Sequence, residues 1–350
     1  MGLEGELRIG LRVNAGRVGE VRIESTRPDV AHALLRGRTR VEIAAAVPLL
    51  FSICGRSQAA ASELACTVAT GESASAPLLE RAAVAVAAEI VREGAWRVLL
   101  EWPRWIGETP DAAAVAAIRG ASAPAIAQAA FGMPAPDWLA LQTRPEFERW
   151  AAAAGTASAR FIQRLRDEDS SDNTASTTPL LDGLRLAANI GRVAKALDSD
   201  PGFASRPTWH GEPAETGALA RLQADPLVAD FSRSGSRVAA RFVARLRELA
   251  LLLVQRGTAQ VGAVAGPGGG IGWVDGARGL LVHRVRFDGP LAERYDIVAP
   301  TEWNFHPRGA LALALRDAPA GDLEALRARA TRLVNSLDPC VGCRIEFDDA

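Results

Sequence analysis

The residues with the clearest chemical potential are the four cysteines, at positions 54, 66, 340 and 343. Two of them form the motif Cys340-Val-Gly-Cys343, in which two intervening residues allow both sulfurs to reach one metal ion. Two buried structural thiols are the plainer interpretation of this pair. A zinc site that uses Cys54, Cys66 and this pair is an alternative, although eleven residues between Cys54 and Cys66 are not a usual zinc-ligand spacing.

Other residue types give weaker chemical signals. The segment Gly266–Trp273 is rich in glycine but lacks the Gly-Lys-Ser/Thr of a phosphate-binding loop. We therefore expect a tight turn or a close approach of two backbones there. The histidines, at positions 32, 210, 283 and 306, share no metal-ligand spacing, and each is expected to be a hydrogen-bonded structural residue. A thioredoxin-like redox pair is disfavoured, because such a pair belongs at a strand-to-helix turn and Cys340 follows an expected helix.

Composition places the chain among ordinary globular proteins, with 48% hydrophobic and 23% charged residues. The 40 Lys and Arg balance the 41 Asp and Glu, which argues against nucleic-acid binding. The first residues carry acids where a signal peptide needs a basic segment, and no apolar run approaches the roughly 18 residues of a membrane span. We expect a cytoplasmic protein without a membrane contact, in a compartment that keeps thiols reduced.

The elements that must position these residues are predicted to be mainly helical. Alternating apolar residues predict a β-hairpin over residues 6–24, and the pattern from about residue 30 to 160 is mainly that of helices. Further helices are expected to begin at Ser236, where Gly257 would close the helix, and at Asp322. The fold class is therefore α+β.

Two further segments complete the predicted organisation. Residues 280–287 have the pattern of a strand, and the polar residues 167–179 predict an exposed loop, because they contain almost nothing to bury. There is no internal repeat and no other break in composition. We therefore expect a single domain over residues 1–350.

Five segments, taken in order, resemble elements of nickel–iron hydrogenase large subunits. They are Ile53-Cys-Gly-Arg-Ser57 with the preceding Leu35-Arg-Gly-Arg38, Glu215-Thr-Gly-Ala-Leu-Ala-Arg221, Ala277-Arg-Gly-Leu-Leu-Val-His283, Val298-Ala-Pro-Thr-Glu-Trp-Asn304 and Asp338-Pro-Cys-Val-Gly-Cys343. The resemblance implies a large-subunit-like helical bundle core with an N-terminal hairpin and short C-terminal strands.

The resemblance also implies a set of site residues. In that family, cysteine pairs near each end of the chain hold nickel through four thiolates, and the second cysteine of each pair bridges to an iron that carries cyanide and carbon monoxide. Soft thiolates suit both metals. The implied metal ligands here are Cys54, Cys340 and Cys343, and Arg278 and Thr301 are implied to surround the diatomic ligands of the iron.

The sequence departs from the family pattern at several of these positions. Ser57 stands where the second N-terminal cysteine is expected, and a hydroxyl is a hard donor that replaces a soft thiolate poorly. Ala61 replaces an expected histidine. Glu346 stands where catalytic subunits carry His or Arg, and the chain ends at Ala350 without a processing peptide. A complete nickel site and catalytic activity are therefore not expected.

This pattern, with Glu302-Trp-Asn-Phe-His-Pro307, is similar to the accessory HupK/HoxV branch of the family. The resemblance implies a non-catalytic maturation protein, a scaffold that transiently holds the Fe(CN)2CO unit. Implied partners are the small maturation chaperone, its iron–sulfur companion and the hydrogenase large subunit. Two alternatives stay open. One is a divergent hydrogenase that uses Ser57 or Cys66 as its fourth ligand, and the other is a metal-free chaperone-like protein of hydrogenase assembly.

Overall fold

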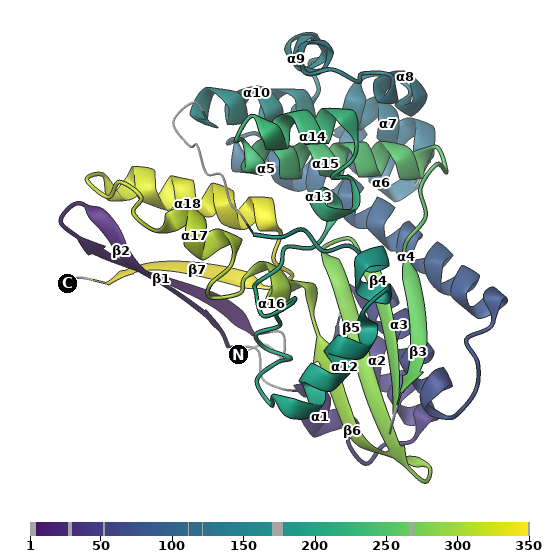
Figure 1. The fold of residues 1–350 in the computed structure, drawn as a ribbon. Helices are drawn as coiled ribbons and strands as arrows, with labels where there is room; N and C mark the ends of the chain where they lie inside the picture. Colours follow the sequence, from purple (N-terminus) through teal and green to yellow (C-terminus); the bar gives the residue numbers. More distant parts are fainter. Residues whose placement is uncertain are drawn as a thin grey trace. The chain divides into compact units, whose positions relative to one another are not determined.

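The computed structural model describes residues 5–26, 30–51, 53–110, 112–120, 122–169, 178–266 and 269–348, and Figure 1 shows its elements. By its internal contacts the chain divides into two compact units. Unit 1 comprises Met1–Val86, Ser176–Ala220 and Ala259–Ala350, and unit 2 comprises Ala87–Ala175 and Arg221–Thr258. The single domain expected from the sequence stays a prediction, because a compact unit need not fold independently.

The expected N-terminal hairpin is confirmed, and it lies beside the C-terminus. Strands β1 (Glu6–Asn14) and β2 (Arg17–Ser25) pair antiparallel across a two-residue turn. Strand β7 (Gly342–Asp348) pairs parallel with β1, and the sheet order is β2-β1-β7 (Figure 1). Leu7, at the start of β1, therefore lies opposite Cys343.

A second, four-stranded antiparallel sheet has the order β3-β4-β5-β6. Its strands are β3 (Val261–Gly266), β4 (Gly269–Gly276), β5 (Gly279–Asp288) and β6 (Leu291–Val298). Strand β5 contains the predicted strand at residues 280–287, and that prediction is confirmed.

Glycines let helix α3 (Gly55–Ala69) lie directly on strand β4. A Cβ atom added at Gly270 would lie 2.3 Å from the carbonyl oxygen of Ala65, and one added at Gly272 would lie 2.2 Å from that of Ala61. No real Cβ atom tolerates such a distance. The expectation that the glycine-rich segment allows a close backbone approach is confirmed.

The four-stranded sheet also packs against the segment that contains helices α11 (Gly183–Ala187) and α12 (Ile190–Ser199). A buried apolar cluster contains Val193 of α12 together with Trp273 and Val282 of the sheet. Trp273 and Val282 lie opposite each other on β4 and β5. Apolar contact therefore holds this segment on the sheet.

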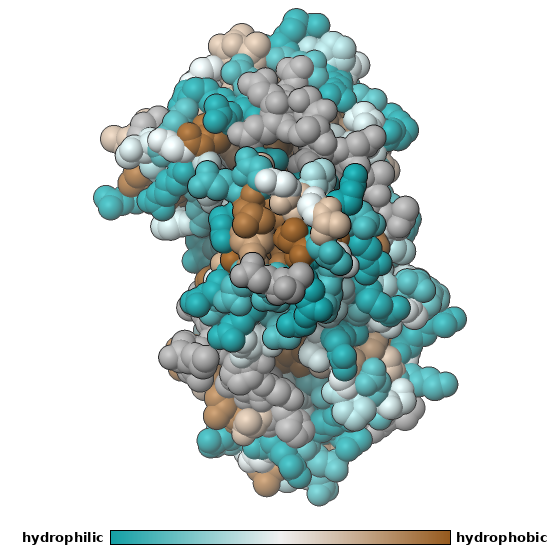
Figure 2. Space-filling view, turned by 90° about the vertical axis from the view of Figure 1, so that its left-hand side faces the viewer, coloured by the Kyte–Doolittle hydropathy of each residue, from teal (hydrophilic) through white to brown (hydrophobic). Residues whose placement is uncertain are grey.

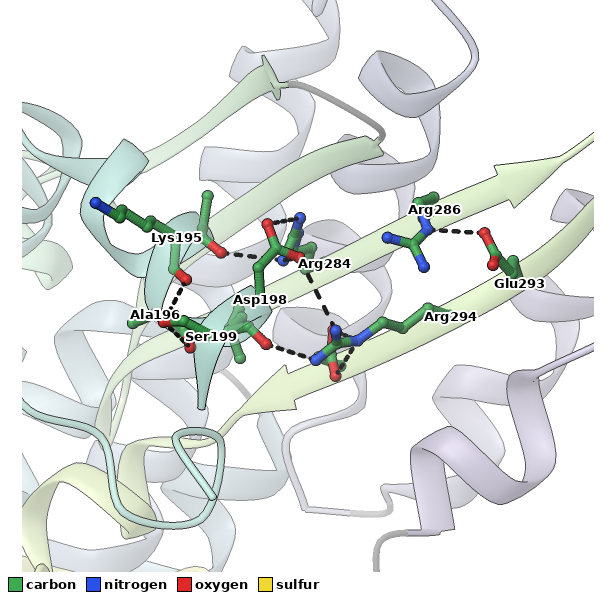
Figure 3. Close-up of polar contacts among 11 residues, drawn as sticks. Lys195, Ala196, Asp198, Ser199, Arg284, Arg286, Glu293 and Arg294 are labelled. Atoms are coloured by element: carbon green, nitrogen blue, oxygen red, sulfur yellow. Dashed lines mark hydrogen bonds and ion pairs between the residues drawn. The ribbon is translucent and has the colours of Figure 1, made fainter. Parts of the chain in front are cut away.

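Charged contacts fix the end of α12 on strands β5 and β6 (Figure 3). Asp198 accepts two hydrogen bonds from the Arg284 guanidinium, at 2.7 and 2.8 Å. These bonds hold the pKa of the Asp198 carboxyl below its usual value. Arg294 donates to the carbonyl oxygen of Leu197 at 2.6 Å, where a cation is favoured by the helix dipole.

The remaining helices of unit 1 are short, except α18. Asp322 accepts hydrogen bonds from two backbone amides and begins α18, as expected, and Asp338 ends it with a positive φ of 59°. The helices are α1 (Val30–Leu35), α2 (Arg40–Leu50), the first part of α4 (Ala76–Trp96), α13 (Ala218–Arg221, whose last residue belongs to unit 2), α16 (Pro300–Asn304), α17 (Ala310–Leu315) and α18 (Leu323–Leu337).

The described residues of unit 2 form helices and the segments that connect them, without a strand. The core of unit 2 contains stacked aromatic rings such as Phe131 on Trp138, with centroids 4.5 Å apart. Besides the last part of α4 it contains the π-helical turn η1 (Arg97–Glu101), α5 (Trp102–Trp105), α6 (Ala112–Gly120), α7 (Ala123–Phe131), α8 (Ala135–Leu139), α9 (Arg144–Ala153), α10 (Ala157–Asp169), α14 (Pro226–Arg233) and α15 (Arg237–Leu253).

Two predicted boundaries in unit 2 are wrong. Helix α15 begins after Ser236 as expected but ends at Leu253, before Gly257. Val254 is its C-cap residue, and the Val254 amide donates to the carbonyl oxygens of Ala250 and Leu252. Helix α10 continues through Asp169, since the backbone hydrogen bonds of a helix tolerate charged residue types. The predicted loop at 167–179 therefore begins too early, and its residues 170–177 lie outside the described residues.

The surface carries few large apolar side chains. In the described ranges, no helix is long and apolar enough to cross a membrane. The face in Figure 2 is mostly hydrophilic, with a limited hydrophobic area near its centre. Exposed apolar side chains such as Val41, Val84 and Leu184 come from different helices, as is normal for a protein surface.

Candidate functional site

The C-terminal cysteine motif meets helix α16 at a contact between Thr301 and Cys340. The Thr301 hydroxyl lies 3.0 Å from the Cys340 sulfur, and the Cys340 amide donates to the same hydroxyl at 3.5 Å. Both residues are buried. Pro300 begins α16 and places Thr301 in its first turn, while Cys340 follows the end of α18. The structure thus brings together two of the five predicted site residues.

Arg278 lies in the turn between β4 and β5, beside the same motif. Its Nε atom is 3.9 Å from a carboxylate oxygen of Asp338, and both side chains are buried. Asn304 of α16 donates to the carbonyl oxygen of Arg278 at 3.1 Å and accepts from the Thr216 amide at 2.8 Å. Hydrogen bonds and an ion pair therefore join four of the five sequence segments that resemble hydrogenase elements.

The fold requires a glycine at position 279, directly after Arg278. Gly279 has a φ of +120°, a conformation that other residues rarely adopt. A Cβ atom at this position would also lie 2.1 Å from the Thr216 hydroxyl oxygen. Gly279 therefore lets the turn that carries Arg278 reach Thr216.

The fifth segment begins helix α3, where Cys54 is the N-cap residue. Cys54 is half-buried and accepts a hydrogen bond from Nε2 of Gln58 at 3.6 Å. Ser57 is buried, and a Cβ atom added at Gly276 would lie 2.9 Å from its hydroxyl oxygen. The serine that replaces the expected cysteine thus faces the β4–β5 turn that carries Arg278.

Cys343 lies on strand β7, opposite Leu7 of β1, and is exposed. Desolvation by its neighbours, with a smaller contribution from the Glu6 carboxylate, raises the pKa of Cys343 to about 11. The sulfur therefore carries a proton near neutral pH, and a metal ion would have to displace that proton.

Cys66 lies too far along α3 to share a metal ion with Cys54. Cys66 lies twelve positions after Cys54, which corresponds to a rise of roughly 18 Å along a helix. Burial raises the pKa of Cys66 to about 11. A metal site that contains both Cys54 and Cys66, whether a zinc site or a hydrogenase site with Cys66 as the fourth ligand, is therefore excluded.

Sequence reasoning missed a group of buried polar residues behind Cys54. Gln58 bonds to His283, His283 bonds to Tyr295, and Tyr295 bonds to Ser62. The four-residue spacing of Cys54, Gln58 and Ser62 on a predicted helix was the available signal. The structural role expected of the histidines is confirmed for His283, which is bonded at both ring nitrogens.

The predicted metal ligands do not form a closed cage. Among the residues that the structure describes, no group of three or more His, Cys, Asp or Glu side chains is placed to hold a metal ion. The observed donors are soft sulfurs, of which Cys340 is paired with a hydroxyl. Such donors fit a soft metal unit that brings its own ligands better than a bare ion. The assignment of Cys54, Cys340 and Cys343 as ligands stays a prediction.

Comparison with known proteins shows which proteins the chain is similar to. A family model described as nickel-dependent hydrogenase matches residues 258–346. The chain is 31% identical to the hydrogenase expression/formation protein HoxV of Cupriavidus necator, over 94% of this chain and 93% of that protein. It is also 31% identical to the hydrogenase expression/formation protein HupK of Rhizobium leguminosarum bv. viciae, over 99% of this chain and 97% of that protein.

The fold is similar to that of the Ni-Fe-Se hydrogenase from Desulfomicrobium baculatum in its reduced, active form. The TM-score is 0.62 at 16% identity, and the match covers 95% of this chain and 96% of that chain. The expected hydrogenase large-subunit-like fold is thereby confirmed. This chain belongs to the family of the HoxV and HupK hydrogenase expression/formation proteins.

Proposed function

We propose that this chain is a non-catalytic protein of hydrogenase maturation, on which the Fe(CN)2CO unit is assembled or from which it passes to the hydrogenase large subunit. The iron unit is its cargo. Ser57 is the observation that carries the proposal, because its buried hydroxyl lies next to the Arg278 turn, at the position where the family resemblance implies a bridging thiolate. The similarity to expression/formation proteins over nearly the whole chain supports the maturation role.

The residues around Cys340 have distinct roles in holding such a cargo. Cys340 would bind the iron through its sulfur, and Thr301, 3.0 Å away, supplies a hydroxyl that can donate to that sulfur. The guanidinium of Arg278, beside Asp338, supplies positive charge and N–H donors for the cyanide ligands. One soft donor fewer, at Ser57, weakens the hold on the iron and favours release.

The partners follow from the shared fold. A chaperone that delivers the iron unit to a hydrogenase large subunit would meet a similar fold in this chain. We therefore include the small maturation chaperone, its iron–sulfur companion and the large subunit among the partners. A cytoplasmic location accords with this role, because a reducing compartment keeps Cys54, Cys340 and Cys343 as thiols.

A second candidate function is that of a metal-free chaperone-like protein. It is favoured by the finding that no three metal-binding side chains converge among the described residues. Such a protein would need none of the cysteines for its activity.

Cysteine variants in cells that mature a hydrogenase distinguish the two functions. For the scaffold, Cys340→Ala and Cys343→Ala should each strongly lower hydrogenase activity, while Cys66→Ala, a matched change roughly 18 Å from Cys54 along α3, should leave it near the wild-type level. Full activity in all three variants would instead establish the metal-free role. Stoichiometric nickel and hydrogen turnover by the purified chain would overturn both and identify a divergent hydrogenase.

A further inference from the structure

Strand β7 is an edge strand with an open outer side. The three-stranded sheet has the order β2-β1-β7, and among the described residues no strand pairs with the outer edge of β7 (Figure 1). A Cβ atom added at Gly342, the first residue of β7, would meet no described atom within 4 Å beyond its chain neighbours. Cys343 and Glu346 are exposed. An open edge of this kind is a template for pairing with a strand of another chain.

The apolar face of this sheet is incompletely covered at β7. Residues in register on two paired strands have their side chains on the same face of the sheet, so Ile345 and Phe347 share the face of Ile9 and Leu11. Ile9 and Leu11 are fully buried, whereas Ile345 and Phe347 are only half-buried. A further strand beside β7 would therefore cover apolar area that a single copy of the chain leaves open.

A hydrogen bond to Ile345 indicates which backbone groups of β7 point to the outer edge. The carbonyl oxygen of Ile345 accepts from Nη1 of Arg327 at 2.9 Å, so it points away from β1. The backbone groups of Cys343 and Phe347, two positions away on either side, point to the same edge. Arg327 is exposed, so its bond can give way to a backbone amide of another strand while water takes its place at the guanidinium.

The sequence of β7 is complementary to itself when two copies run antiparallel. If Ile345 lies opposite Ile345 of a second copy, Arg344 of each copy lies opposite Glu346 of the other. Opposite charges directly across two strands are stabilising, and like charges are destabilising. A shift by two residues would place Arg344 opposite Arg344 or Glu346 opposite Glu346, and a shift by one residue would put charged side chains opposite apolar ones. The residues of β7 therefore favour one register.

Both charged residues are available for such pairs. The Arg344 side chain is 62% exposed, and its Nε atom lies 2.9 Å from a carboxylate oxygen of Glu6. Glu346 lies opposite Gly10 of β1, which has no side chain to pair with it. In a dimer, Arg344 would keep Glu6 on one side and gain Glu346 of the second copy on the other.

We propose that two copies of this chain pair antiparallel through β7, with Ile345 at the two-fold axis, and that the second copy covers Cys343. In this register Cys343 lies opposite Phe347 of the second copy, with Cβ atoms about 5 Å apart, and a sulfur packs favourably against an aromatic ring. The dimer thus covers a sulfur that is exposed in the single chain. Only the meaning of this cover, as part of a metal site, rests on the proposed function.

Charge exchange across the two-fold axis tests the dimer. Sedimentation velocity of the purified full chain should show an equilibrium of monomer and dimer. Arg344→Glu should weaken the dimer about 10-fold or more, because both cross-strand pairs become pairs of like charge, and Glu346→Arg should do the same. A mixture of the two variants should form the dimer as the wild type does, since each copy then meets the opposite charge.

A matched control separates this effect from a general change of surface charge. Arg286→Glu reverses an arginine on β5 of the other sheet, where Arg286 pairs with Glu293 at 2.8 Å, and should leave the dimer unchanged. A wild-type chain that stays monomeric at its highest soluble concentration would overturn the inference. A dimer that neither Arg344→Glu nor Glu346→Arg weakens, or that their mixture fails to restore, would overturn it as well.

The reactivity of Cys343 tests the position of the second copy. Alkylation of Cys343, measured by mass spectrometry of its peptide, should slow as the wild-type concentration rises through the dissociation constant of the dimer. In Arg344→Glu alone the rate should not change over the same range. A rate that stays constant while the wild-type dimer forms would overturn the proposed register. None of these results bears on whether Cys343 binds a metal, because the experiments use metal-free protein.

Discussion

At the scale of single residues, the pairing of Thr301 with Cys340 links helix α16 to the C-terminal motif. Thr301→Val removes the hydroxyl with little change of shape, so we expect a loss of about 1 kcal/mol in the free energy of unfolding. Urea denaturation measures the loss. Thr331→Val is the control, because the Thr331 hydroxyl bonds only within its own exposed helix turn. Equal losses in the two variants would contradict a specific role for Thr301.

His283 makes the stability of the protein depend on pH. Burial lowers its pKa from the usual 6.5 to about 3, so between these values the unfolded chain binds a proton that the folded chain does not. This contribution to stability is therefore complete above pH 6.5 and is lost as the pH falls toward 3. We expect wild-type protein to lose about 1 kcal/mol more than His283→Gln between pH 7 and pH 5.5.

Urea denaturation at the two pH values measures this difference. His210→Gln, at an exposed position, is the control and should follow the wild type. A His283→Gln variant with the same pH dependence as the wild type would show that His283 is not buried as a neutral residue.

The sequence indicated that His283 is structural but not which residues it contacts. Its partners are Tyr295, 12 positions away, and Gln58, 225 positions away. Periodicity reports which face of an element a residue occupies, but it does not report which distant element covers that face. The contacts of His283 with Gln58 and Tyr295 therefore could not be predicted without the structure.

At the scale of elements, the contact of α3 with β4 depends on missing side chains. Gly272→Ala would place a Cβ atom 2.2 Å from the carbonyl oxygen of Ala61, so helix and strand must separate. We expect a loss of about 3 kcal/mol in the free energy of unfolding, at the upper end of the usual cost of overpacking. Calorimetry or urea denaturation measures it. Gly266→Ala should change little, because an added Cβ atom there would meet no atom of the other described residues within 4 Å. Equal losses in the two variants would contradict the close packing.

A strand in which apolar and polar residues alternate strongly was predictable from the sequence, whereas the strand that pairs with it was not. Leu7, Ile9 and Leu11 alternate with less buried residues, and this pattern located the hairpin. Strand β7 instead has mostly exposed residues, and its partner β1 lies at the other end of the sequence. Only the fold could show that the two ends of the chain form one sheet.

At the scale of the whole molecule, the order of the motifs predicted the fold better than any single motif. Four of the five segments are joined through Asn304, Arg278 and the contact of Thr301 with Cys340. Thr216, Arg278, Thr301, Asn304 and Asp338 are buried there. Hydrogen bonds at Asn304 and the geometry of Gly279 thus hold these segments together within the hydrogenase-like fold.

Infrared spectroscopy of the chain, purified anaerobically with its maturation partners, tests the scaffold role most directly. We predict cyanide and carbonyl stretching bands from the wild-type protein, their loss in Cys340→Ala, and their retention in Cys66→Ala. The absence of these bands from the wild-type protein, in cells whose hydrogenase large subunit still receives its iron unit, would contradict the scaffold role.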